Sequence, residues 1–260
     1  MAITTKATKI MKRKILNFLL GLLPLLIFLL FWEFLISTTE RKLFLFSSPS
    51  RIFFSLKENL LNGVLVRDIF ITGQEALFGF LIGNIFGAFV GLTLWYSKRI
   101  AKLARPYIIA IGSVPIFSIA PMMIMWFGTG LYAKIMMAAL STVIVAITQS
   151  YEGASQVEGQ QIKLFQSFGA TRFQIFIKLI VPSSLVWLFN SLKLNISFAL
   201  LGAFIAEYIS ASEGLGHRIF KAGGTYDVSL VLASVLCIIL LALFFSGIIY
   251  LIEKTFMSWK

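Results

Sequence analysis

Residues 155–182 read SQVEGQQIKLFQSFGATRFQIFIKLIVP and form most of a polar insertion between two strongly apolar runs. Two short helical patterns, about 155–167 and 171–180, meet at Gly169, a residue type that suits a sharp helix end. Pro182 marks the point at which the next apolar run begins. We therefore expect two short helices, joined at Gly169 and followed by Pro182, that form a compact docking segment.

The chain around this insertion is too apolar for a soluble domain. Of its 260 residues, 58% are hydrophobic and 13% are charged, whereas soluble domains have about 45–50% and roughly 25%. A single core cannot hide so much apolar surface, so most of it must face lipid. The composition excludes a soluble enzyme and a nucleic-acid binder, despite a net charge of +12, and predicts an all-α integral membrane protein.

The apolar runs predict six transmembrane helices, because each crossing needs about 20 predominantly apolar residues. The predicted spans are 15–36, 69–95, 106–127, 131–149, 183–205 and 228–251. The polar segments are an N-terminal tail (1–14), a loop (37–68) with a short amphipathic helix (51–61) at the outer surface, the insertion (150–182), a glycine-rich loop (206–227) and a C-terminal tail (253–260).

The basic residues predict the orientation of these spans. With the N-terminus inside, 14 of the 23 Lys and Arg side chains fall in inner segments and 8 in outer segments, with Lys193 inside a span. Cytoplasmic loops carry such an excess of Lys and Arg. Both termini and the 150–182 segment are therefore predicted to be cytoplasmic.

The second predicted span contains four regularly spaced glycines. They recur every four residues, one turn after Glu75, at Gly79, Gly83, Gly87 and Gly91. This spacing keeps them on one helix face, where a second backbone can approach closely. We expect a helix-packing seam, and the alternative is a gating or ion-contact role for Glu75.

Two other spans contain candidate pathway residues. Pro115 and Pro121 each remove a helix hydrogen bond from the third span, either as a simple kink or as a hinge that lines a pathway. In the fifth span, Ser184, Ser191 and Asn195 share one face, and Lys193 lies on an adjacent one. These polar faces line either a water-accessible pathway or contacts between helices.

No enzyme or metal constellation is visible in the sequence. His217 stands alone in a glycine-rich loop, Cys237 is the single cysteine, and no Walker-type glycine loop is present. We expect no metal, no cofactor and no catalytic site in this chain. Energy for any transport must come from an ion gradient or from another subunit.

The 155–182 segment resembles the cytoplasmic signature of the permease subunits of binding-protein-dependent ABC importers, E-A-A-x3-G-x9-I-x-L-P. Gly169 and Pro182 match at the required separation, and Leu179 and Val181 are conservative replacements. The run after the glycine, with Ala170 and Arg172, also looks like the family's. The departure is Lys163-Leu164-Phe165 in place of Glu-Ala-Ala, which implies a bulkier ATPase groove or an altered partner.

Further stretches are similar to the branch of this family associated with nitrate, sulfonate, taurine and thiamine- or riboflavin-related substrates. They are Ser47-Ser48-Pro49-Ser50, Val114-Pro115 to Pro121, Trp126-Phe127-Gly128-Thr129-Gly130, and Ala206-Glu207 with Glu213-Gly214-Leu215-Gly216. The resemblance covers about residues 47–252 and implies a type I ABC importer permease fold, with residues 69–252 as its transmembrane domain.

The resemblance also implies partners and location. It implies a second permease copy, either identical to this chain, as a homodimer, or different from it, as a heterodimer. A cytoplasmic ATPase dimer would use ATP and grip the 155–182 segment, and an extracytoplasmic binding protein would deliver a small hydrophilic solute. The chain would lie in a bacterial inner or plasma membrane.

Two rival interpretations remain at this point. A gradient-driven secondary transporter would use Glu75 and Lys193 as coupling groups. A membrane scaffold without transport would need neither an ATPase nor a pathway.

Overall fold

The computed structural model describes residues 20–210 and 212–256, and every regular element in these ranges is helical. The all-α prediction is therefore confirmed. In chain order the elements are Leu20–Ile36, α2 (Glu40–Phe46), α3 (Pro49–Leu61), α4 (Val64–Thr93), η1 (Leu94–Tyr96), α5 (Lys98–Gly112), α6 (Ile116–Phe127), α7 (Leu131–Ser155), α8 (Gly159–Ser167), α9 (Arg172–Ile175), η2 (Phe176–Ile180), α10 (Val181–Ser210), α11 (Leu215–Gly224) and α12 (Val228–Phe256).

Within the described residues, four continuous helices are long and apolar enough to cross a membrane. They are Val64–Tyr96, Leu131–Ser155, Arg172–Ser210 and Val228–Phe256, and a bent pair, α5 with α6, would make a fifth. Leu20–Ile36 is a shorter apolar helix, while residues 1–19 of the predicted tail and first span lie outside the described residues. The count of six spans and the cytoplasmic placement of both termini stay predictions.

The third predicted span, 106–127, is not one straight helix. The chain is helical from Lys98, breaks after Gly112 and resumes at Ile116, with an angle of 88° between α5 and α6. Pro115 is the N-cap residue of α6 and has an extended backbone. A proline disfavours the helical conformation at the residue before it and has no N–H to donate, so a helix does not continue easily through this position. The basic stretch 98–105, which lies between the second and third predicted spans, is therefore the first half of α5.

The fifth predicted span does not begin at Pro182. α9, η2 and α10 join into one helix, Arg172–Ser210, and Pro182 lies inside it. The intervening turn, Phe176–Ile180, is a π-helix, a wider turn that commonly accommodates local disruption of the α-helical ladder. This turn precedes the proline directly, so the helix continues where the sequence predicts a boundary.

Small residues bring α4 and α7 into close contact. A Cβ atom added to any of four glycines of α4 would lie closer to a residue of α7 than real Cβ atoms essentially ever do. The pairs are Gly79 with Ala138, Gly83 with Thr142, Gly87 with Ala146, and Gly91 with Ser150. Each α7 residue stands 59 positions after its glycine, so the two helices run parallel in a fixed register. We call this contact the glycine seam.

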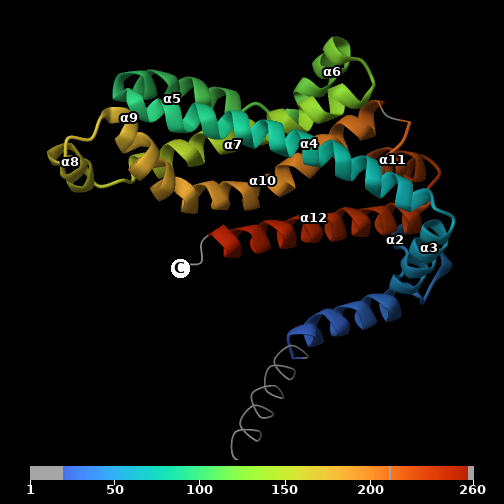
Figure 1. Cartoon of the computed structure of the whole chain (residues 1–260). Coiled ribbons are helices and arrows are strands. Elements are labelled where there is room, and N and C mark those ends of the chain that lie inside the picture. The colour runs from blue at the N-terminus through green and yellow to red at the C-terminus, as the bar shows by residue number, and fades with distance from the viewer. Residues whose placement is uncertain (1–19, 211, 257–260) are drawn as a thin grey trace, which may run out of the picture.

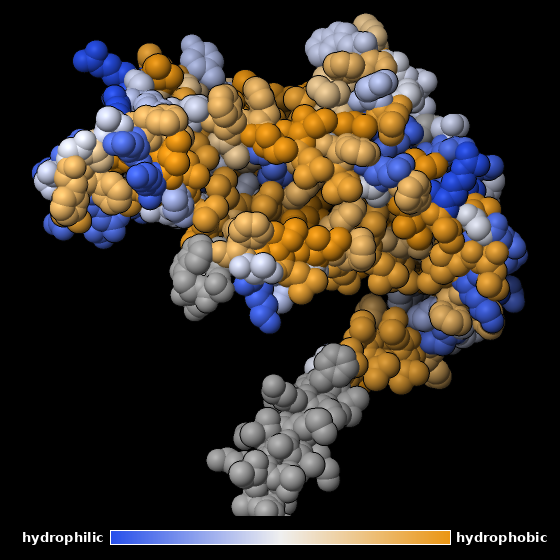
Figure 2. All heavy atoms as spheres, viewed as in Figure 1, coloured by the Kyte–Doolittle hydropathy of each residue, from blue (hydrophilic) through white to orange (hydrophobic). Residues whose placement is uncertain are grey.

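The long helices lie alongside one another, with α5 running along the bundle and α6 projecting from it, and the other labelled short helices lie toward its two ends (Figure 1). α7 packs against both α4 and α10, and α12 runs beneath α10. α8 and α9 lie at one end, whereas α3 and α11 lie at the other. Apolar side chains cover the flank between these ends, and hydrophilic side chains concentrate near the ends themselves (Figure 2).

Candidate functional site

A glycine turn shapes the exposed end at α8 and α9. Gly169 has a φ of +74°, the left-handed conformation that glycine adopts without strain. The amide of Ala170 donates to the Phe165 carbonyl at 3.1 Å, and that of Gly169 to the Gln166 carbonyl at 2.9 Å. This is the Schellman pattern, which ends α8 and reverses the chain. Thr171 and Gln174 then form a reciprocal capping box that starts α9.

Arg172 fastens this turn to the end of α4. Its guanidinium lies 5.8 Å from the Trp95 ring centroid and 5.6 Å from that of Tyr96, and it donates to the Tyr96 carbonyl. Phe176 stacks against the same two rings, with centroids 4.9 Å from Tyr96. The cation–π and aromatic contacts hold α9 and η2 against η1.

The side chains of this segment divide into an inner and an outer set. Phe165 and Ala170 pack against a small core that contains Ala154, Ile175 and Ile180. The outer set includes Lys163 and several large apolar side chains: Leu164, Phe168, Phe173 and Ile177 are 54%, 79%, 63% and 49% exposed. We call Leu164, Phe168, Phe173 and Ile177 the apolar docking face. Exposed apolar side chains next to polar ones are typical of a protein-binding surface.

The polar residues predicted on the fifth span are buried within this chain. Ser184 donates to the Ile180 carbonyl, and the amide of Asn195 donates to Asn84 Oδ1 on α4 at 2.6 Å and to Ser191 Oγ at 3.3 Å. The Asn195–Asn84 bond joins α10 to α4 and fits the alternative of polar contacts between helices, whereas the bonds of Ser184 and Ser191 stay within one helix. A pathway-lining role for Ser184, Ser191 and Asn195 stays a prediction, as does that of Pro115, which is exposed at the α5–α6 break.

Glu75 and Lys193, the pair considered for gradient coupling, do not meet. Lys193 Nζ lies 2.6 Å from Glu253 Oε2 on α12, and its side chain is 42% exposed. Glu75 Oε1 lies 2.9 Å from Lys134 Nζ on α7. Each of the two residues therefore has a separate ion-pair partner.

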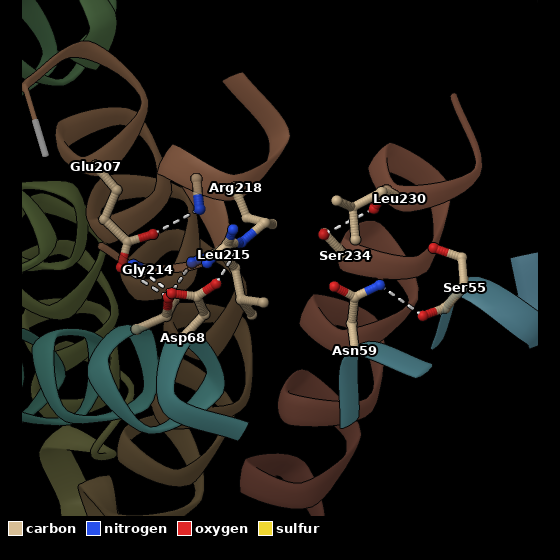
Figure 3. A network of polar contacts seen from close by, with 11 residues as sticks. Ser55, Asn59, Asp68, Glu207, Gly214, Leu215, Arg218, Leu230 and Ser234 are labelled. Carbon is tan, nitrogen blue, oxygen red and sulfur yellow. Dashed lines mark hydrogen bonds and ion pairs between the residues drawn. The ribbon is translucent and has the colours of Figure 1, made fainter. Parts of the chain in front are cut away.

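At the other end of the bundle, buried carboxylates hold the segment Gly214–Arg218 (Figure 3). Asp68 on α4 accepts from the Gly214 amide at 3.0 Å and from Arg218 Nε at 2.7 Å. Glu207 on α10 accepts from the Gly216 amide at 2.7 Å and from the Thr72 hydroxyl at 2.6 Å. We call Asp68, Thr72, Glu207 and the segment Gly214–Arg218 the outer-end network.

The glycines of this network make room for Glu207. A Cβ on Gly214 would overlap the Glu207 carboxylate, and one on Gly216 would lie 2.5 Å from the Phe204 carbonyl oxygen. Gly214 also has a φ of +104°. The Glu-Gly-Leu-Gly stretch that carries part of the family resemblance is thus the piece of chain that Glu207 binds.

Sequence reasoning missed Asp68, Thr72, Lys134 and Arg218. Lys134 could have been found, because 134, 138, 142, 146 and 150 on α7 repeat at the same spacing as Glu75 and the four glycines. In the described residues no three His, Cys, Asp or Glu side chains gather where they could hold a metal ion.

Residues 83–257 match the family model described as "Binding-protein-dependent transport system inner membrane component". The chain is similar to the formylaminopyrimidine transport permease protein ThiX of Halalkalibacterium halodurans, at 26% identity over 70% of this chain and 73% of the relative. It is also similar to the putative aliphatic sulfonates transport permease protein SsuC of Bacillus subtilis, at 26% identity over 82% and 77%.

A solved structure shares the fold. The MetNI methionine ABC transporter, in an inward-facing conformation, has a chain that superposes with a TM-score of 0.66 at 18% identity. The match covers 75% of this chain and 96% of that chain.

Proposed function

The chain belongs to the family of binding-protein-dependent transport system inner membrane components, and from this premise we propose how it works as a permease subunit. It is a multi-pass membrane protein of an ABC importer, which favours ATP-driven import over the gradient-driven alternative. We propose that a separate ATPase dimer docks on the apolar docking face and supplies the energy, so that this chain is itself non-catalytic.

The exposed surface of the 155–182 segment is the observation that carries this proposal. Leu164 and Phe168 project from the end of α8, and Phe173 and Ile177 continue the apolar surface along the next helix. Lys163 adds a positive charge beside them. Such a face would bury well in a groove wider than one built for alanines, which would accommodate Lys163 and Leu164, whereas Phe165 packs inward against the rest of this chain.

The remaining coupling residues would position this face. Gly169 and Ala170 complete the turn, Phe165 packs inward, and Arg172 ties the turn to α4. Pro182 lies in the helix that continues from the docking face into α10. A rigid-body movement of the ATPases would therefore reach both α4 and α10, the two helices that α7 holds together.

We propose a second permease copy, most simply an identical one, and an extracytoplasmic binding protein as further partners. The names of the relatives support two solute classes, aliphatic sulfonates and a formylaminopyrimidine. Both are small and hydrophilic, and nitrate or taurine belong to the same class of polar solutes. The solute would be handed over at the end of the bundle that carries the outer-end network.

Two glycine variants test this function. Gly169→Trp strains a backbone with φ of +74° and changes the direction of the docking face, whereas Gly159→Trp adds the same bulk at an exposed position of α8 without a positive φ. We expect Gly169→Trp to insert normally, to lose the co-purifying ATPase and to abolish uptake, and Gly159→Trp to retain both. Full uptake by Gly169→Trp, or uptake without any ATPase, would refute the proposal.

A further inference from the structure

The glycine seam begins with a charged pair. Glu75 stands one turn before Gly79, and Lys134 stands 59 positions after Glu75, so the ion pair continues the register of the glycines. Both side chains are buried, at 1% and 9% exposure. Glu207, which is fully buried, reaches from α10 to the same face of α4, where it accepts the hydroxyl of Thr72, one turn before Glu75.

The charges around this cluster do not balance. α4 contributes Asp68 and Glu75, α7 contributes Lys134, α10 contributes Glu207, and α11 contributes Arg218. The neighbouring titratable groups are the Cys237 thiol of α12, the half-buried His217 imidazole of α11 and the pair Arg67–Glu213 at the surface. Asp68 and Arg218 neutralise each other, with the Asp68 carboxylate 2.7 Å from Arg218 Nε. Two carboxylates, Glu75 and Glu207, are then left with one ammonium group.

A buried excess charge of this kind is costly unless the site takes up a counter-charge. Lys134 already occupies the cation position beside Glu75 Oε1. Glu207 accepts the Thr72 hydroxyl at one oxygen and the Gly216 amide at the other. Within the described residues Glu75 Oε2 is buried and receives no donor. A hydrogen atom between the two carboxyl groups would supply that donor and remove the excess charge.

We propose that Glu75 and Glu207 form a buried proton-binding site that holds one shared proton. With the proton in place, Glu207 keeps its bonds to Thr72 and Gly216, and these bonds fasten the start of α11 to α4. Loss of the proton leaves two adjacent carboxylates that repel each other. Glu207 then withdraws, and the Gly214–Arg218 segment loosens from the bundle.

Infrared spectroscopy on the full chain with its ATPase partner in lipid tests this directly. A protonated carboxyl group has a C=O stretch that a carboxylate lacks and that shifts in deuterated water. We expect this band at neutral pH in the unmodified protein and its loss at alkaline pH. Glu75→Gln keeps an oxygen for Lys134 and an N–H for Glu207, so it should fold and lack the band. Glu213→Gln, an exposed carboxylate in the same region, is the matched control and should keep it.

The thermal midpoint, Tm, provides a second measurement. Because the proton stabilises the folded state and is released as the pH rises, Tm of the unmodified protein and of Glu213→Gln should fall toward alkaline pH. Tm of Glu75→Gln should stay constant across that range. Glu207→Gln repeats both measurements with the other carboxyl replaced.

Two results would overturn the proposal. One is the absence of a protonated-carboxyl band at neutral pH, or its persistence in both Glu75→Gln and Glu207→Gln. The other is a rise in Tm caused by sodium ions at constant alkaline pH in the unmodified protein and not in Glu75→Gln, which would make the site a cation site.

Discussion

A single methyl group at the middle of the glycine seam should separate two helices. In Gly83→Ala the new Cβ would lie 2.5 Å from the Ala139 carbonyl oxygen and would overlap the Thr142 hydroxyl. The hydroxyl can rotate away, but the carbonyl belongs to the α7 backbone. α4 and α7 must therefore move apart, and the neighbouring glycine contacts must open with them.

The cost can be compared with that of a control on the same helix. Overpacking costs about 1–3 kcal/mol, and each kcal/mol shifts Tm by about 2–4 °C in a chain of this size, so Gly83→Ala should melt roughly 2–12 °C below Gly73→Ala, which gains the same helix propensity without the overpacking. In Gly73→Ala the added Cβ would lie 3.6 Å from Leu241, an ordinary contact. Alanine favours helix over glycine by about 1 kcal/mol, so Gly73→Ala should melt at an equal or higher temperature.

Thermal unfolding of both variants in the same lipid or detergent checks the argument. Adding Thr142→Ala to Gly83→Ala removes the hydroxyl and leaves the carbonyl contact, so it should restore only part of the lost stability. If Gly83→Ala melts as high as Gly73→Ala, the seam is not closely packed and the register derived from it is wrong.

Two further predictions concern ion contacts. Arg172→Ala removes the cation–π and carbonyl contacts to η1, so we expect the ATPase to stay bound while the number of ATP molecules hydrolysed per solute imported rises; an unchanged ratio would contradict a positioning role. Lys193→Ala breaks a half-exposed pair worth at most about 1 kcal/mol, so uptake in reconstituted vesicles should persist. Elimination of uptake would instead favour Lys193 as a coupling group.

Two prolines show why the sequence predicted the apolar segments better than the points at which the helices break. Pro115 and Pro182 both interrupt apolar runs, and both were expected to bend or start a helix. The chain breaks at Pro115 and continues through Pro182. The difference lies in the π-helical turn Phe176–Ile180 and in the aromatic contacts that hold Phe176 against η1. Neither can be read from the residues next to the proline.

The 155–182 segment was the part of the candidate site most open to prediction, because a glycine turn and a capping box are short-range features. The outer-end network was not, since Asp68 and Arg218 are 150 positions apart and meet only through the packing of α4 and α11. Lys134 is an intermediate case. Its partner follows from the register of two small-residue repeats, once those repeats are aligned.

The unbroken helix Arg172–Ser210 has a mechanical consequence. At about 1.5 Å per residue, the 35 steps from Arg172 to Glu207 span roughly 52 Å. We propose that this helix transmits movement along its length. If it tilted as one body by about 5°, one end would move by roughly 4–5 Å relative to the other, by the same rise per residue. A force applied at the turn beside Tyr96 would then reach the carboxylate that binds Gly216 through the helix itself.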